Sequence, residues 1–140
     1  MAPPFYISTD KSKLDLDIIE GYLANHSYWA KGRSRNTIEK SIRNSLCFAV
    51  YTAEDKQVGF ARVVSDFAVF AFILDVFILD EYQRQGLGKL LMQGIIDHPE
   101  LQGLQRWGLG TLDAHGLYEK FGFRIAAHPE RMMEIINPPQ

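Results

Sequence analysis

The segment VFAFILDVFILDEYQRQGLGKLLMQGII, residues 69–96, decides the fold. Residues 69–79 form an apolar run whose only charge is Asp75, and such a run predicts a buried strand. The glycine-rich hexapeptide at 83–88 follows, and after it apolar residues recur at helical spacing: Leu87, Leu90, Leu91 and Ile95. The segment therefore predicts a strand, a glycine-rich turn and a helix in succession.

A glycine-rich turn between a strand and a helix is suited to binding phosphate. The first N–H groups of a helix have no intrahelical partner, and the helix dipole places partial positive charge at the same end. Glycine lets a pyrophosphate approach the backbone because it has no Cβ, and Arg84 and Lys89 add full charges. P-loop and Rossmann signatures are absent. The alternative is that the glycines only allow close packing at the start of the helix.

Two blocks of sequence carry a family resemblance. The first is DVFILDEYQRQGLGKLL at 75–91, and the second is DAHGLYEKFGF at 113–123. In this order they resemble the pyrophosphate-loop region and the late helix and strand of the GNAT superfamily of acetyl-CoA-dependent N-acetyltransferases. The resemblance implies an α+β GNAT fold, with a central mixed, mostly antiparallel sheet of about six to seven strands flanked by about four helices.

The remaining patterns are compatible with that architecture. A helix is expected after Asp10 or Ser12, and a second near Asn36, whose spacing to Glu39 is that of a capping box. A last helix at 114–121 is expected to end at Gly122. Further strands are predicted at 5–8, 46–52, 57–64, 106–112, 123–126 and 131–136. Antiparallel hairpins with segregated helices favour an α+β class.

Length and composition predict one soluble domain spanning residues 1–140. The chain is 46% hydrophobic and 23% charged, and its longest apolar run is too short to span a bilayer. The N-terminal residues lack a signal-peptide pattern, so we expect a cytoplasmic protein that does not bind membranes. Cys47 is the only cysteine, and its apolar neighbours indicate a core residue rather than a nucleophile.

The resemblance implies that a primary amine of a small molecule attacks the thioester of acetyl-CoA, which serves as co-substrate, without a metal. The amine must first lose its proton, because an alkylamine with a pKa of about 10.4 is almost entirely protonated at pH 7. The thioester oxygen needs hydrogen-bond donors as it gains negative charge. The thiolate leaves more easily if a general acid protonates it.

The resemblance also assigns coenzyme contacts. It implies that the backbone of Val76, Phe77 and Ile78 holds the pantetheine arm. The pyrophosphate is then expected on the loop and the first helical turn: Gln83, Arg84, Gln85, Gly86, Leu87, Gly88 and Lys89. Asp113 departs from the family pattern, where Asn is frequent, so an amide contact to the pantetheine is not expected there.

Tyr118 matches the tyrosine of the family's late helix and is the expected general acid. It also belongs to one helical stripe with Ala114, Leu117 and Phe121, which by itself favours a core position. A phenol suits both interpretations, because its ring is apolar and its tip is polar.

Asp75 is the candidate general base, or an anchor for the amine. A carboxylate in an apolar strand is costly to bury unless it is paired or faces a cleft. The alternative is that Asp75 accepts hydrogen bonds from a neighbouring loop, with ordered water taking the amine's proton. His115 is a second candidate base, although a lone histidine at a helix start is more often a capping or surface group.

The acceptor side is expected in the segment 26–33, between the first two helices, with Tyr28, Trp29 and Arg33 as substrate-binding residues. Aromatic side chains next to Arg33 would suit an amine that carries a carboxylate. The alternative is that Trp29 packs into the core and Arg33 is solvated.

The sequence also allows other functions, but the signals for them are weaker. The basic cluster in 31–43 invites a nucleic-acid interpretation, but the formal net charge is −2 and no recognition motif accompanies it, so no nucleic-acid partner is expected. A protein acetyltransferase acting on lysine or an N-terminus, and a non-catalytic acyl-CoA-binding sensor, remain alternatives. The presence of Tyr118 at the position of the family's tyrosine favours an enzyme over a sensor. The sequence is also compatible with a homodimer.

Overall fold

Residues 4–138 are described by the computed structural model. Its strands are β1 Phe5–Ser8, β2 Leu46–Thr52, β3 Gln57–Ser65, β4 Phe70–Ile78 and β5 Arg106–Leu109. Its α-helices are α1 Leu16–Asn25, α2 Arg35–Arg43, α3 Leu87–Ile96 and α4 His115–Glu119. The strand, glycine turn and helix predicted from the segment 69–96 are confirmed as β4, the loop before α3, and α3.

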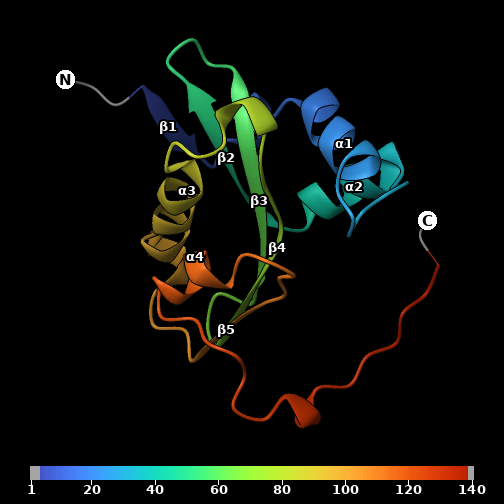
Figure 1. The fold of residues 1–140 in the computed structure, drawn as a ribbon, viewed down its shortest axis with the longest axis vertical. Coiled ribbons are helices and arrows are strands. Elements are labelled where there is room, and N and C mark those ends of the chain that lie inside the picture. The colour runs from blue at the N-terminus through green and yellow to red at the C-terminus, as the bar shows by residue number, and fades with distance from the viewer. Residues whose placement is uncertain (1–3, 139–140) are drawn as a thin grey trace.

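The five strands form one sheet in the order β1-β2-β3-β4-β5. The strands β1 to β4 pair with one another antiparallel, and β5 pairs with β4 in parallel. Helices α1 and α2 cover one face of the sheet, and α3 and α4 cover the other (Figure 1). This arrangement confirms the α+β class and the mixed, mostly antiparallel sheet.

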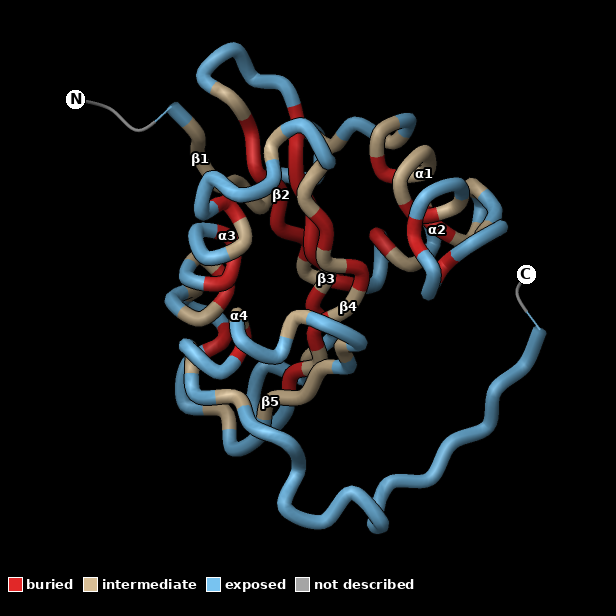
Figure 2. Tube along the Cα trace, in the orientation of Figure 1, coloured by how far each residue is buried: buried red, intermediate tan, exposed pale blue. Residues whose placement is uncertain are grey.

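Each face of the sheet has its own apolar core, visible as the buried segments of Figure 2. Side chains of α3, including Leu91 and Met92, pack on Phe48 and its neighbours on one face. Ile19 of α1 and other helical residues pack with Cys47 on the opposite face. Cys47 is buried, and burial raises the pKa of its thiol to about 11, so the prediction of a core residue is confirmed.

A bulge interrupts β4 at its centre. Phe60 pairs with Phe77 but Arg62 pairs with Leu74, so two residues of β4 face one residue of β3. Asp75 lies at this bulge with a φ of 55°, in the left-handed region that non-glycine residues rarely adopt. The pairing of β4 with β5 stops at Ile73 and Leu109. Beyond this point β4 continues without β5, and its carboxyl end borders the loop that leads to α3.

Several sequence predictions were wrong in detail. The sheet of the described residues has five strands rather than six or seven, because 123–126 and 131–136 pair with no strand in this chain. Ser34, not Asn36, caps α2, since its hydroxyl accepts from the Thr37 N–H. Asp15 caps α1, and Asp10 caps the short turn before it. β5 and α4 are also shorter than predicted.

Candidate active site

A cavity of about 520 Å³ lies where the α1–α2 connection, the end of β4 and the first turns of α3 and α4 meet. Many residues predicted from the sequence line it: Tyr28, Trp29, Val76, Phe77, Ile78, Gln83, Arg84, Gly86, Leu87, Gly88 and Tyr118. Gln85, Lys89, Arg33 and Asp75 are not among its lining residues. The structure thus brings most of the predicted coenzyme and acceptor residues to one cavity, but Asp75 and Arg33 lie outside its wall.

The glycine loop presents an uncapped helix end to the cavity. Gly86 precedes α3 with a φ of 79°, and no side chain caps the helix. The Gly86 carbonyl accepts the Leu90 N–H at 3.0 Å, so the preceding N–H groups of the first turn have no helical partner. Arg84, in the same loop, also has a positive φ, of 66°. These features suit a phosphate ligand.

Gln83 holds the loop against the end of β4. Its side-chain Nε2 donates to the carbonyl of Ile78 at 2.9 Å and to Oδ1 of Asp80 at 3.2 Å. The amide group is therefore used to fix the loop. Packing at the other side is tight, because a Cβ on Gly88 would lie 3.3 Å from a methyl group of Leu117. Gly88 therefore serves close packing, while the phosphate-binding role of the loop stays a prediction.

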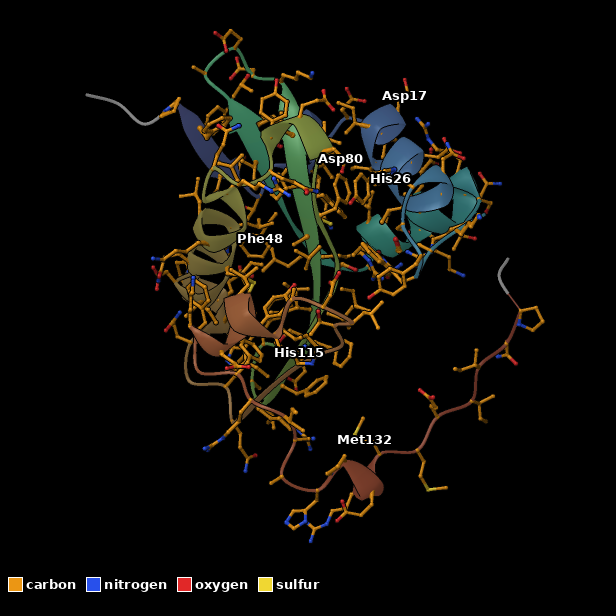
Figure 3. The ribbon with its side chains drawn as sticks, viewed as in Figure 1. Asp17, His26, Phe48, Asp80, His115 and Met132 are labelled. Atoms are coloured by element: carbon orange, nitrogen blue, oxygen red, sulfur yellow. The ribbon has the colours of Figure 1, made fainter. Side chains whose placement is uncertain are left out.

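Tyr118 belongs to the core and to the cavity wall at once. Only 7% of the residue is exposed, and its ring meets that of Phe123 edge-on with centroids 6.1 Å apart. Burial raises the pKa of Tyr118 above 10, and the nearby Tyr28 and Asp113 raise it further. The phenol therefore stays protonated at neutral pH and can donate a proton. His115 begins the same helix but is exposed (Figure 3).

Asp75 is the centre of a buried hydrogen-bond network. Its Oδ1 accepts from Nε1 of Trp29 at 3.0 Å. Its Oδ2 accepts from Nη1 of Arg33 and from Nε of Arg62, both at 2.9 Å. The side chain is 2% exposed. In the structure, Asp75 accepts hydrogen bonds from a neighbouring loop, which was the alternative to a role as general base. The role as general base stays a prediction.

Arg62 belongs to the Asp75 network but was not predicted from the sequence. Besides Asp75, it contacts Ser45, whose hydroxyl accepts from Nη1 at 3.0 Å. Its side chain is 12% exposed, so the strand holds a nearly buried cation. The sequence contained a signal for this contact. Arg62 is the only charged residue in the apolar part of β3, just as Asp75 is in β4.

The α1 side of the cavity is aromatic and was also missed. Tyr22 stacks on Phe77 of β4, with ring centroids 4.2 Å apart and planes 8° apart. His26 Nε2 lies 3.1 Å from Oδ2 of Asp80, and Figure 3 shows these two side chains facing each other. Trp29 is 38% exposed and, through its hydrogen bond to Asp75, joins the cavity wall to the buried network. It is therefore not a simple core residue.

Residues 44–125 match the acetyltransferase (GNAT) domain family. The chain belongs to this family. A crystal structure from Xanthomonas campestris pv. campestris, described as GNAT, superposes on 97% of this chain and 95% of its own length, with 43% identity and a TM-score of 0.93. A Gibberella zeae protein named as an acetyltransferase is 31% identical, over 83% of this chain and 76% of its own. A Pyropia yezoensis protein named N-acetyltransferase ycf52 is 30% identical, over 84% and 69%.

The GNAT assignment confirms the resemblance seen in the sequence and makes this protein an acetyl-CoA-dependent acyltransferase. Acetyl-CoA is the co-substrate that the family implies. Among residues 4–138, no helix is both long and apolar enough to cross a membrane. Within that same range, no group of three or more His, Cys, Asp or Glu side chains is placed to hold a metal ion.

Proposed function

We propose that this GNAT enzyme transfers the acetyl group of acetyl-CoA directly to the primary amine of a small molecule that carries an anionic group. The observation that supports it is the single cavity that joins the uncapped start of α3 to Tyr118 and to the aromatic loop with Tyr28 and Trp29. A coenzyme that spans these points would bring its thioester to the acceptor side. The direct attack that we propose requires no metal.

In this proposal the pyrophosphate binds the free N–H groups at the start of α3, with Arg84 supplying a full charge at the rim. The pantetheine runs along the end of β4, where Val76, Phe77 and Ile78 line the cavity and β5 no longer pairs. The bulge beside this stretch turns its backbone, so polar main-chain groups can face the ligand.

The chemical step needs an acid and a route for the amine proton. We assign the acid to Tyr118, which lines the cavity and stays protonated at neutral pH because burial raises its pKa. The electron pair of the amine forms the new amide bond, the carbon–sulfur bond breaks, and the thiolate takes the proton of the phenol. Water in the cavity takes the ammonium proton before this attack, since both oxygens of Asp75 already accept hydrogen bonds, and the proton that leaves the new amide nitrogen returns through water to the Tyr118 phenolate.

We infer that the acceptor carries an anionic group from the net charge of the buried network around Asp75. Two guanidinium groups, Arg33 and Arg62, share the one carboxylate of Asp75. The network therefore carries an excess positive charge, and the Arg33 side chain is 22% exposed. An acceptor carboxylate or phosphate near Arg33 would balance that charge. A protein acceptor remains the alternative.

A screen of amines with detection of free CoA tests the proposal. It should include pairs that differ only in charge, such as amino acids and their amides, and N-terminal and lysine peptides. We expect turnover with anionic amines and a kcat/KM at least about tenfold lower for each neutral partner. Equal values within every pair would reject the anionic acceptor, and turnover only with peptides would reject the small molecule.

A further inference from the structure

We propose that this protein forms a dimer by exchanging its C-terminal residues, 131–136, which pair with the open edge of β5 in a second copy. We call residues 124–138 the C-terminal arm. The arm leaves the domain after α4 and runs outward as an extended chain (Figure 1), and every one of its residues is exposed (Figure 2).

The arm has the composition of a buried strand. Met132, Met133, Ile135 and Ile136 are 63%, 93%, 89% and 80% exposed in the single chain. Met132 lies on the part of the arm that projects from the domain (Figure 3). So many large apolar side chains in one short exposed segment indicate a surface that another molecule covers. The sequence predicts a strand at 131–136, and the single chain supplies no partner for it.

The sheet offers a matching edge. β5 has β4 as its only strand neighbour within residues 4–138, so its other edge is free to pair. Large apolar side chains are also exposed in the hairpin next to it: Val64, Phe67, Val69 and Phe70. This hairpin is joined to β5 directly, because the Val69 carbonyl accepts the N–H groups of Gln105 and Arg106. We call these four side chains the hairpin patch.

A second copy of this chain fits this edge better than any unrelated partner. Exchange of an identical segment satisfies both subunits at once, because each arm covers the edge and the hairpin patch of the other. The Xanthomonas structure covers 97% of this chain with a TM-score of 0.93, so the matched part includes most of the arm.

Sedimentation velocity and amide hydrogen exchange together test whether two copies swap their C-terminal arms. We expect wild-type protein to sediment with twice the mass of one chain, with slow amide exchange in 131–136 and in β5. The double variant Ile135→Lys/Ile136→Lys should raise the dimer dissociation constant at least about 100-fold, because it places charges in a buried strand. Both positions are exposed in the single chain, so folding of the domain should not change.

Leu90→Lys is the matched control, because Leu90 is an exposed apolar residue of α3, outside the arm and the hairpin patch. It should leave the dimer intact. A wild-type monomer with a protected arm would mean that the arm folds back on its own β5, and would overturn the proposal. A dimer whose arm amides exchange rapidly with solvent would overturn it too, and so would a monomer whose arm amides are unprotected. Neither measurement depends on acetyl-CoA, so the proposed catalytic function is tested separately.

Discussion

The guanidinium of Arg33 donates to the carboxylate of Asp75 at 2.9 Å across 42 positions of sequence. This contact ties the loop where we propose that the acceptor binds to the bulge of β4, which lies beside the proposed coenzyme site. Trp29 makes a second bond between the same two elements. The acceptor loop is thus positioned by the strand that would hold the pantetheine.

Asp75→Asn tests whether Asp75 positions the loop or acts as a base. Asn keeps the shape but leaves Arg33 and Arg62 without their counter-ion. We expect the free energy of unfolding to fall by about 3 kcal/mol and the KM for the acceptor to rise more than kcat falls. The pH profile of kcat/KM should keep its acid limb. Loss of that limb, with an unchanged KM, would instead identify Asp75 as the base.

Tyr118→Phe removes the proposed proton donor and keeps the ring in its place against Phe123. Turnover should fall by about 10²–10⁴-fold where chemistry limits the rate, while acetyl-CoA affinity stays within about twofold. Tyr82→Phe is the control, since Tyr82 also lines the cavity but has no role in the proposed step. Because burial raises the pKa of Tyr118, its ionisation should not reduce wild-type turnover at neutral pH. Wild-type turnover in Tyr118→Phe would leave this residue a purely structural role.

Gly86→Asp and Gly86→Asn form a matched pair for the phosphate site. Both residues tolerate the left-handed conformation that the φ of 79° requires, and a Cβ there meets no atom within 4 Å. The two variants therefore differ mainly in charge. We expect calorimetry to show acetyl-CoA binding about 10- to 100-fold weaker in Gly86→Asp than in Gly86→Asn, because its carboxylate repels the pyrophosphate. Equal affinities would place the pyrophosphate elsewhere.

The buried thiol of Cys47 should make the free energy of unfolding fall at alkaline pH. Its thiol pKa is 9.0 in the reference state and about 11 in the folded protein, so the folded state favours the neutral thiol. The stabilisation is complete below pH 9 and is lost as the pH rises through 11. Between pH 8 and 10, the free energy of unfolding of the wild type should fall by about 1 kcal/mol more than that of Cys47→Ala. Parallel profiles for the two proteins would show that Cys47 does not cause the loss.

Local patterns predicted the parts of the fold that depend on neighbouring residues. The glycine turn was readable because the conformation of Gly86 and the free N–H groups of α3 are properties of one short segment. Helix starts were less well predicted, since several polar residues competed to cap each helix. Ser34 rather than Asn36 caps α2, because its hydroxyl is the one that reaches the Thr37 N–H.

The sequence by itself determined the strand, turn and helix of residues 69–96, the α+β class and the position of Tyr118, because periodicity and glycine placement act over a few residues. Only the tertiary structure decided that Trp29, Arg33 and Arg62 converge on Asp75. Those contacts depend on how three separate elements pack. The same reason applies to 131–136, where the pattern predicts a strand but a strand forms only when another strand supplies its hydrogen-bond partners.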